Sequence, residues 1–369
     1  MLPGLAAVSH PARAENAPDQ GVLAFKQGYY RDSQPGWDRV SVNSPQVYLL
    51  APLAGEWSVE AAVVGDSISG ATPRMHRFRT GATPYMSDFR RAGELRVTRY
   101  LPRGAVTIGT GYSAENDYRS SSFSINVRWS SDDNNQTWAL GLASSGDDID
   151  NLKSGGSVSN QHRRTYELLA GFTQVMTEND LLQLNLTHSR GRGFYTDPYK
   201  DFDQRPDFRN STTAMIRWNH YVERFDASAR SSYRYYRDTF GVKSHTVDFE
   251  CVQPVGVWTV TPGLRYYSQG AANFYFGPMP NSQGQADYGA TLRYASQLTG
   301  NYSADARLAA FGALAVSLKT SYALNPETTV DLKLEHYRQS AALKLGGSGS
   351  PYLDPFRARF VLVGITRKF

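Results

Sequence analysis

Apolar and polar residues alternate in short stretches along nearly the whole chain, and this pattern limits the fold more than any other feature. In one stretch Phe123, Ile125, Val127 and Trp129 alternate with serine, asparagine and arginine. Similar stripes occupy 57–63, 182–187, 214–219, 247–251, 258–265 and 330–335. A period of two indicates strands with two different faces. The sequence therefore predicts an all-β protein.

Alternation alone fits a soluble β-sandwich as well as a membrane barrel. Many stripes carry an aromatic residue at or near one end, which is typical of the interfacial girdles of a barrel. The predicted girdle residues are Trp57, Trp129, Trp138, Trp218, Trp258 and Tyr266. Connections also tend to alternate between short and long, as periplasmic turns and extracellular loops do. These features favour a transmembrane antiparallel β-barrel of the outer-membrane type.

The chain ends on a strand whose last residue is Phe369. Counting back by twos gives Arg367, Ile365, Val363 and Val361, so the strand is apolar at alternate positions apart from Arg367. A terminal strand of this kind resembles the signal that the outer-membrane barrel assembly machinery reads. We therefore expect Phe369 to act as an assembly signal and that machinery to be a partner.

The pattern predicts about sixteen strands in one barrel over residues 21–369, although fourteen or eighteen remain compatible with it. The ranges are 22–31, 38–52, 56–66, 88–101, 105–114, 118–131, 136–145, 162–176, 179–190, 209–221, 225–237, 242–252, 256–270, 304–322, 327–338 and 356–369. An even count places both termini of the chain on the same side of the membrane, which we take as the periplasm. The long connections, near 67–87, 146–161, 191–208, 271–303 and 339–355, then all fall outside. Within the fourth of these, 286–296 could extend a strand or form an external hairpin.

Residues 1–20 are expected to lie outside the barrel. The segment Leu2–Ser9 is mildly apolar, and Ala12-Arg13-Ala14 looks like a signal-peptidase site. It resembles the tail of a signal peptide, with a disordered segment as the alternative.

Several classes of protein and site do not fit this sequence. It has no apolar run of 18 residues, which excludes a helical membrane span. Cys251 is the single cysteine, which excludes disulfides and multi-thiolate metal sites. The net charge is +5 and the basic residues are scattered, so we expect no nucleic-acid partner. No cofactor is expected.

Charged residues at the polar positions of the stripes are predicted to line the lumen. The selectivity candidates are Arg217, Arg230, Arg234, Asp248, Glu250, Arg265, Asp331, Lys333 and Glu335, and Glu60, Arg96, Arg128 and Glu167 share the pattern. Charges on opposite walls could select solutes, or could simply form ion pairs that stiffen the wall. In RSSYRYYRD and LRYYSQ, arginine and tyrosine stand close in sequence and could bind an anionic or aromatic solute. This reading predicts that Arg234→Ala or Arg265→Ala lowers anion preference.

Two acidic segments in the long loops are weak metal candidates. One contains Asp147, Asp148 and Asp150, and the other is TDPYKDFD at 196–203. Their spacing does not match an EF-hand, so a solvated loop is the favoured reading. The second segment could instead fold inward as a constriction.

A membrane-embedded hydrolase is the least favoured hypothesis. A pair such as Ser244 with His245 could be read as nucleophile and base, but neighbours in sequence do not establish that geometry. G-x-S-x-G is absent. Histidines with hydrogen-bond partners at the membrane interface are the favoured reading, and Cys251 is expected to be inert.

Six long blocks of unusual composition resemble an uncharacterised bacterial family, domain of unknown function thirty-five seventy. They are GDSISGAT (65–72), TDPYKDFD (196–203), RWNHY (217–221), DASARSSYRYYRDTFGVKSHTVDFE (226–250), PGLRYYSQGAANFY (262–275) and YSADARLAAFGA (302–313). The resemblance covers roughly residues 38–369. It implies an outer-membrane barrel encoded near small lipoproteins and flavin-transfer proteins of the envelope. It carries over no catalytic residues.

These observations lead to three functional hypotheses for a Gram-negative outer-membrane protein surrounded by lipid and lipopolysaccharide. The first is a pore or transport channel with a charged lumen rich in arginine and tyrosine. The second is a barrel that anchors or sheathes a lipoprotein or envelope redox protein. The third is the hydrolase.

Overall fold

The structure, a computed structural model, describes residues 16–70, 86–152, 158–200 and 202–369. The sequence expectations for residues 1–15 and for the loop over 71–85 therefore lie outside the described residues. Within the described part, no helix has the length and apolar character needed to cross a membrane.

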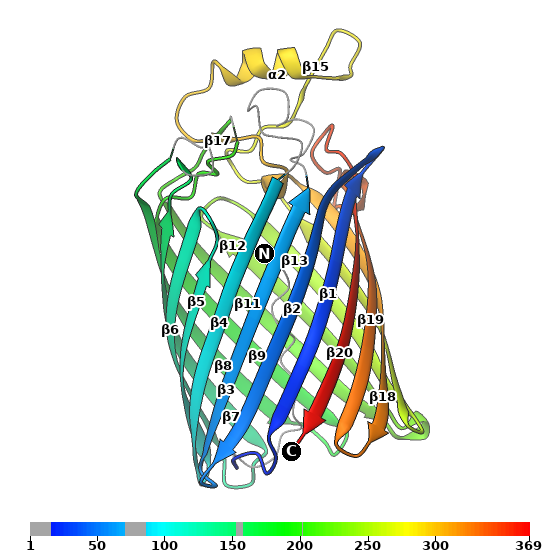
Figure 1. Cartoon of the computed structure of the whole chain (residues 1–369). Coiled ribbons are helices and arrows are strands. Elements are labelled where there is room, and N and C mark those ends of the chain that lie inside the picture. The colour runs from blue at the N-terminus through cyan, green and yellow to red at the C-terminus, as the bar shows by residue number, and fades with distance from the viewer. Residues whose placement is uncertain (1–15, 71–85, 153–157, 201) are drawn as a thin grey trace.

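The described chain forms a closed antiparallel barrel of sixteen strands, which confirms the predicted fold (Figure 1). The wall consists of β1 (Val22–Gln34), β2 (Trp37–Leu53), β3 (Trp57–Gly70), β4 (Met86–Leu101), β5 (Gly104–Ala114), β6 (Tyr118–Ser130), β7 (Gln136–Ile149), β8 (Gln161–Val175), β9 (Asp180–Gly193), β11 (Phe208–Val222), β12 (Ala227–Asp238), β13 (Lys243–Val255), β14 (Trp258–Gln269), β18 (Phe311–Asn325), β19 (Thr328–Ser340) and β20 (Phe356–Lys368). Each strand pairs with its neighbour in this order, and β1 pairs with β20. Closure leaves no strand edge with unpaired N–H and C=O groups facing lipid.

Large apolar side chains point out of the wall at every second position. On β18, Leu314, Val316 and Leu318 are exposed, whereas Ala313 and Ala315 between them are buried. Leu182–Leu186 on β9 and Val361–Ile365 on β20 show the same period. In water such a belt would be unfavourable, but a bilayer solvates it. The lumen face therefore carries the intervening polar residues.

The two ends of the barrel differ in their connections. The end that holds the C-terminus carries short turns, and we call it the turn end (Figure 1). There Gly256 and Val257 join β13 to β14, and Gly256 has φ +60°, as the first position of a type II′ hairpin turn requires. The opposite end, here the loop end, carries all the long connections, as well as short ones such as 239–242.

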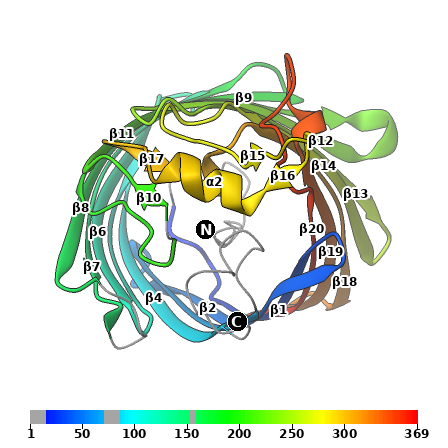
Figure 2. The ribbon, with the colours of Figure 1, turned by 90° about the horizontal axis from the view of Figure 1, so that it is seen from above.

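Additional elements at the loop end correct two sequence expectations. The strand expected from residue 304 begins at Phe311, because Asp305 accepts a hydrogen bond from the backbone N–H of Arg307 and starts a single 3-10 turn, η3 (Ala306–Leu308). The segment 286–296 forms a helix, α2 (Tyr288–Ala295), rather than a further strand, because Asp287 caps its N-terminus. A small hairpin, β15 (Met279–Pro280) with β16 (Ala286–Asp287), precedes it. Seen from above, α2 lies across the mouth of the barrel (Figure 2).

Residues at the seam between the first and last strands contain the expected assembly signal. The backbone N–H of Gly21 donates to the carbonyl of Phe369 at 2.8 Å, and the N–H of Phe369 donates back at 3.0 Å. The Phe369 side chain contributes little to the packed protein, because the residue is 64% exposed.

We expect Phe369→Ser to lower the amount of assembled barrel in cells several-fold, while refolding of purified chain into detergent stays normal. Heat-modifiable gel mobility measures both quantities. Phe225→Ser is the control, because Phe225 is also exposed (61%) at the turn end. Equal losses in cells and in refolding would mean that Phe369 acts through stability, and no loss in cells would remove its role as a signal.

Candidate functional site

The lumen wall between β11 and β19 places charged side chains on successive rows of paired residues. One row contains Arg230, Glu250, Gly263, Ser317 and Glu335, each opposite the next on neighbouring strands. The row beside it, toward the loop end, contains Arg217, Ser232, Asp248 and Arg265. Lys319 and Lys333 stand opposite each other one row nearer the turn end. All nine selectivity candidates alternate with lipid-facing residues and so face the lumen.

Some of these charges form ion pairs within the lumen. Arg265 binds Asp248, and Lys333 Nζ lies 2.9 Å from Glu335 Oε2. Lys319 Nζ lies 4.0 Å from Asp331 Oδ1. Arg234 donates instead to the hydroxyl of Thr246, at 3.3 Å. These contacts fix the side chains against the wall.

Other lumen charges have no ionic partner among the described residues. No carboxylate there lies within 4.0 Å of the guanidinium of Arg217 or Arg230, and Glu250 has no cation within that distance, although it stands opposite Arg230. A charged side chain without an ionic partner is available to a solute that passes along the wall.

The adjoining part of the wall, β5 to β9, presents mostly small or uncharged side chains to the lumen in its middle. They include Gly109, Gly111, Ser122, Ser124, Asn126, Ala139, Gly141, Ala143, Gly171, Gln183 and Asn185, with Arg128 and Glu167 as charged exceptions. Small residues keep this wall thin. The lumen charges are therefore unevenly distributed: they are concentrated on β11 to β19, sparse on β5 to β9, and present again on β3 and β4, where Glu60, Glu94 and Arg96 face the lumen.

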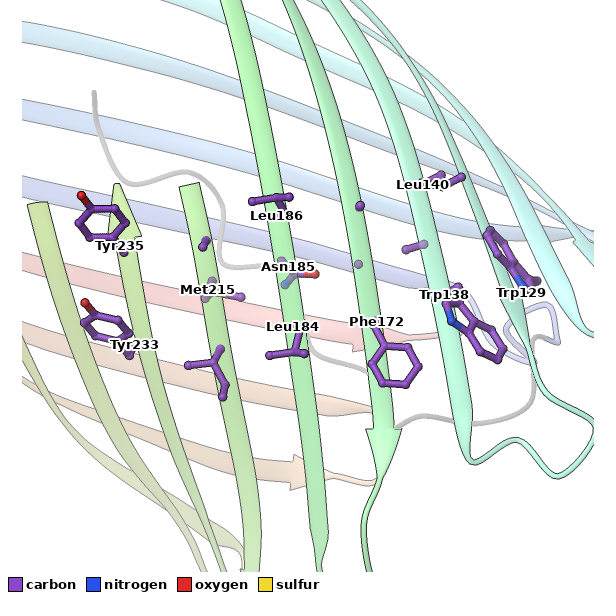
Figure 3. A pocket seen from close by; sticks show the side chains of 15 residues that line it. Trp129, Trp138, Leu140, Phe172, Leu184, Asn185, Leu186, Met215, Tyr233 and Tyr235 are labelled. Atoms are coloured by element: carbon purple, nitrogen blue, oxygen red, sulfur yellow. The ribbon is translucent and has the colours of Figure 1, made fainter. Parts of the chain in front are cut away.

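The tyrosines of the two arginine-tyrosine blocks divide between the faces of the wall, which corrects the idea of a joint cluster. Tyr233 and Tyr235 lie on the outer face, and Figure 3 shows them there. Tyr266 is also on the outer face and donates to the carbonyl of Leu343. In these blocks only Tyr236 and Tyr267 share the lumen face with the arginines, because neighbours along a strand point in opposite directions.

The predicted tryptophan girdle residues lie on the outer face near the turn end. Trp129 and Trp138 stack with their ring centroids 6.0 Å apart, and the ring centroids of Trp258 and Tyr322 are 4.6 Å apart. Arg99 lies over the ring of Trp57, and Trp218 donates from its indole to Asp180 at 2.8 Å. Tyr266 stands near the loop end instead. The tryptophans thus form one layer of the outer surface.

The weak metal candidates do not converge on one point. Asp147 faces the lumen and binds Arg163 at 2.7 Å, whereas Asp148 faces outward and contacts His162 at 2.7 Å. Asp150 accepts from the backbone N–H of Leu152. In the described ranges, no group of three or more His, Cys, Asp or Glu residues is arranged to hold a metal ion.

The serine–histidine pair considered for a hydrolase is excluded by the strand geometry. Ser244 is buried on the lumen side, whereas His245 points outward and its Nδ1 lies 2.8 Å from the hydroxyl of Tyr233. His188 and His220 likewise point outward, toward Thr212 and Asp180. These histidines have hydrogen-bond partners on the outer face of the barrel.

A packed cap at the loop end is the feature that sequence reasoning missed. Its apolar core joins Phe240, Val242, Ala272 and Leu308, which come from two connections and are all at most 5% exposed. The ring centroid of Phe240 lies 5.0 Å from that of Phe274. Two backbone hydrogen bonds hold the segments together: the N–H of Ala272 donates to the carbonyl of Leu308, and the N–H of Asn273 donates to the carbonyl of Phe240, both at 2.8 Å.

An ion network beside this core ties the loop 194–207 to the loop 270–310. Asp305 is 1% exposed, and three cations surround it: Arg205 Nη2 at 2.7 Å, Arg307 Nη2 at 2.5 Å and Lys200 Nζ at 3.7 Å. Arg307 also binds Asp197, and Arg205 also binds Asp203. A two-stranded sheet, β10 (Asp203–Gln204) with β17 (Tyr302–Ser303), adds main-chain bonds. In this paper we call these residues the cap lock.

The electrostatics of the cap lock keep Asp305 ionised. Burial alone would raise the pKa of this carboxyl, but the charge of Lys200 and the charge and hydrogen bonds of Arg307 outweigh burial and hold the pKa well below its usual range. Burial would lower the pKa of Arg307, but its bond to Asp305 and the charges of Asp305 and Asp197 raise it. Nearby, burial raises the pKa of Tyr275 to about 12. The lock is thus fully charged at neutral pH.

The segment TDPYKDFD supplies Asp197, Lys200 and Asp203 to this lock. Tyr199 of the same segment binds Asp117, at the far connection between β5 and β6. Seen from above, the β10 region lies inside the outline of the wall (Figure 2). In the sequence this segment stood out as a run of charges with a proline and two aromatic residues. Its partner Asp305 could not be identified from the sequence, because it lies 100 residues from Arg205 along the chain.

Comparison with solved structures shows the same fold at very low sequence identity. A bacterial polysaccharide outer membrane secretin is 8% identical with a TM-score of 0.50, over 97% of this chain and 100% of that chain. CdiB from Acinetobacter baumannii is 8% identical with a TM-score of 0.49 over 93% of this chain, and this chain covers 60% of that one. OpdK from Pseudomonas aeruginosa, solved with vanillate, is 9% identical with a TM-score of 0.44, over 95% and 98% of the two chains.

Family comparison confirms the resemblance inferred from the six blocks. No curated protein matches the sequence. The model of one family, described as protein of unknown function (DUF3570), matches residues 1–360 of the 369. A match over nearly the whole chain establishes that this protein belongs to the DUF3570 family.

Proposed function

We propose that the protein is a pore in the outer membrane of a Gram-negative bacterium, with the loop end outside and the turn end in the periplasm. Its solutes are small anions. A barrel of sixteen strands is wide enough for a water-filled channel.

The observation that supports this most directly is the exposure of the lumen side chains. The side chains of Arg265, Arg96 and Lys319 are 56%, 49% and 46% exposed, although they point into the barrel. A lumen packed with protein side chains would bury them. This exposure supports a hydrated path through the middle of the barrel, which a pore requires.

The charge distribution supports an anionic solute. Arg217 and Arg230 stand without an ionic partner among the described residues, on the charged wall beside the largely neutral strands β5 to β9. A guanidinium binds a carboxylate through two parallel hydrogen bonds. Arginines on one side of a water-filled lumen therefore favour anions over cations.

We expect Arg217→Gln to lower the anion-to-cation permeability ratio, and Arg265→Ala to lower it further. The second change removes a cation and also frees the carboxylate of Asp248. A unit charge contributes about 1 kcal/mol at roughly 4 Å in water, so each lost charge lowers the ratio on the order of fivefold. Reversal potentials in planar bilayers under a salt gradient measure it.

Arg367→Gln is the matched control, because Arg367 is exposed and lies on the outer face at the turn end. Unchanged selectivity in both lumen variants would refute the assignment of the charged wall. A partner lipoprotein or redox protein that co-purifies at native expression level, together with absence of conductance, would favour the scaffold hypothesis instead.

A further inference from the structure

We propose that the outer face of β8 and β9 holds a lipid whose headgroup carries phosphate. The phosphates bind Arg164, Arg190 and Arg192, and an acyl chain lies in the groove below them. This site is separate from the lumen and does not depend on whether the barrel conducts.

The first argument is an arrangement of like charges that the protein itself does not neutralise. Arg164 stands directly opposite Arg192 on the neighbouring strand, and Arg190 is the next outward residue on β9. All three are exposed. Like charges directly opposite in a sheet are destabilising. A bound anion would turn this repulsion into attraction.

No carboxylate among the described residues forms an ion pair with these arginines. Asp148, an acidic residue on the outer face of the neighbouring β7, stands opposite His162 and contacts it at 2.7 Å. The site is therefore an unneutralised cation cluster. Phosphate suits such a cluster, because guanidinium forms bidentate bonds with its oxygens.

The same arrangement recurs at two other points around the loop end. Arg237 stands opposite Lys243 on β12 and β13, and Arg338 stands opposite Arg357 on β19 and β20. All four are exposed on the outer face. In both places a histidine, His245 or His336, separates the cations from the apolar belt. A cation layer directly above the belt faces the level at which lipid headgroups lie.

The second argument is an apolar groove on the outer surface, whose lining residues Figure 3 shows. It has a volume of about 630 Å³. Trp138 and Phe172 border one side, Tyr233 and Tyr235 the other, and the small residues Ala170 and Ala214 leave the floor low. Such a depression accepts a hydrocarbon chain.

The groove and the cation cluster share the same strands. Along β9 the outward residues run from Leu184 and Leu186 in the groove through His188 to Arg190. Four residues of strand separate Leu186 from Arg190, which is about 13 Å. One amphiphile can therefore place its chain in the groove and its headgroup on the arginines.

The charges favour a lipid over a second copy of this chain. A two-fold interface sets each patch against the same patch of its partner. That arrangement would bring two sets of arginines together in a dry contact, which is unfavourable.

Native mass spectrometry of the full chain, in neutral detergent after delipidation, tests the proposal. The probes are bis-phosphorylated lipid A, the same lipid without its phosphates, and inorganic phosphate as a competitor. Wild-type protein is expected to retain one bis-phosphorylated lipid in preference to the dephosphorylated one. We expect R164Q/R190Q/R192Q to weaken retention by at least about tenfold, since charge-assisted hydrogen bonds are lost. Ala214→Trp, which fills the groove, should weaken it without changing charge.

Two variants serve as controls, and heat-modifiable mobility verifies that every variant is folded. R99Q/R367Q removes outward arginines at the turn end, and Thr320→Trp adds bulk on the outer face of β18; both should bind as wild type. Equal retention of the dephosphorylated lipid, or wild-type binding by the triple variant, overturns the headgroup site. Displacement by millimolar inorganic phosphate with no effect of Ala214→Trp means a free-phosphate site and overturns the lipid. A dimer in light scattering that Ala214→Trp abolishes assigns the groove to a second copy.

Discussion

Asp305→Asn is expected to release the cap while the barrel stays folded. The change leaves Arg205, Arg307 and Lys200 without their shared buried carboxylate. Removing one partner of a buried ionic network costs about 3–5 kcal/mol, and here the cost comes from Arg205 and Lys200, which are only 10% and 11% exposed and stay desolvated, whereas Arg307 is 67% exposed. The opened cap should therefore become at least about a hundredfold more populated. The sixteen paired strands do not depend on this contact.

Hydrogen exchange and single-channel recording measure this release. The N–H groups of Ser303 and Ala304 donate to Phe274 and Phe202, so they should exchange faster in the variant. If the cap narrows the entrance, conductance should rise. Asp354→Asn is the control, because Asp354 is exposed in the connection between β19 and β20. Unchanged exchange would show that the ions do not hold the cap, and faster exchange at constant conductance would show that the cap is not the constriction.

The pH dependence follows from the lowered pKa of Asp305. A carboxyl whose pKa is lower in the folded protein stabilises it fully above the pKa of unfolded aspartate, about 3.9. That contribution disappears only as the pH falls through the lower, folded value. The exchange rates that report on the cap lock should thus stay constant from pH 7 to about 4, after correction for intrinsic exchange.

Phe240→Ala is expected to have a comparable effect through packing rather than charge. Phe240 is 1% exposed and packs against Tyr195 and Phe274, with the guanidinium of Arg209 4.7 Å from its ring centroid. Truncating a buried phenylalanine costs about 3–5 kcal/mol, from lost burial and from the cavity left behind. Exchange should accelerate at 270–276 and 306–308, and limited proteolysis should cut the cap while the strands resist.

The matched control is Phe225→Ala, at an exposed turn on the opposite end. A double variant of Phe240 and Asp305 then tests whether core and ions form one unit, since coupled neighbours give non-additive free energies. Additive effects would mean that the two halves of the cap open separately. A stable cap in Phe240→Ala would contradict the central place of this residue.

The sequence by itself determined the wall. The two faces of a strand follow from local alternation. Stripes such as 123–129 and 330–335 therefore led to a count of about sixteen strands and assigned Arg217 and Arg265 to the lumen side. The reason is physical: a strand in a barrel meets lipid on one side and the lumen on the other, and its own residues record this with a period of two.

Only the tertiary structure decided the cap and the outer cation cluster. Asp305 meets Arg205 across 100 residues, and Arg164 stands opposite Arg192 only because β8 and β9 pair in one register. The prediction at 304–310 was wrong for the same reason, because the segment resembles a strand in sequence but forms a 3-10 turn whose Leu308 packs in the core with Phe240. Contacts between loops depend on the closed wall that brings their ends together, and no local period in the sequence encodes that proximity.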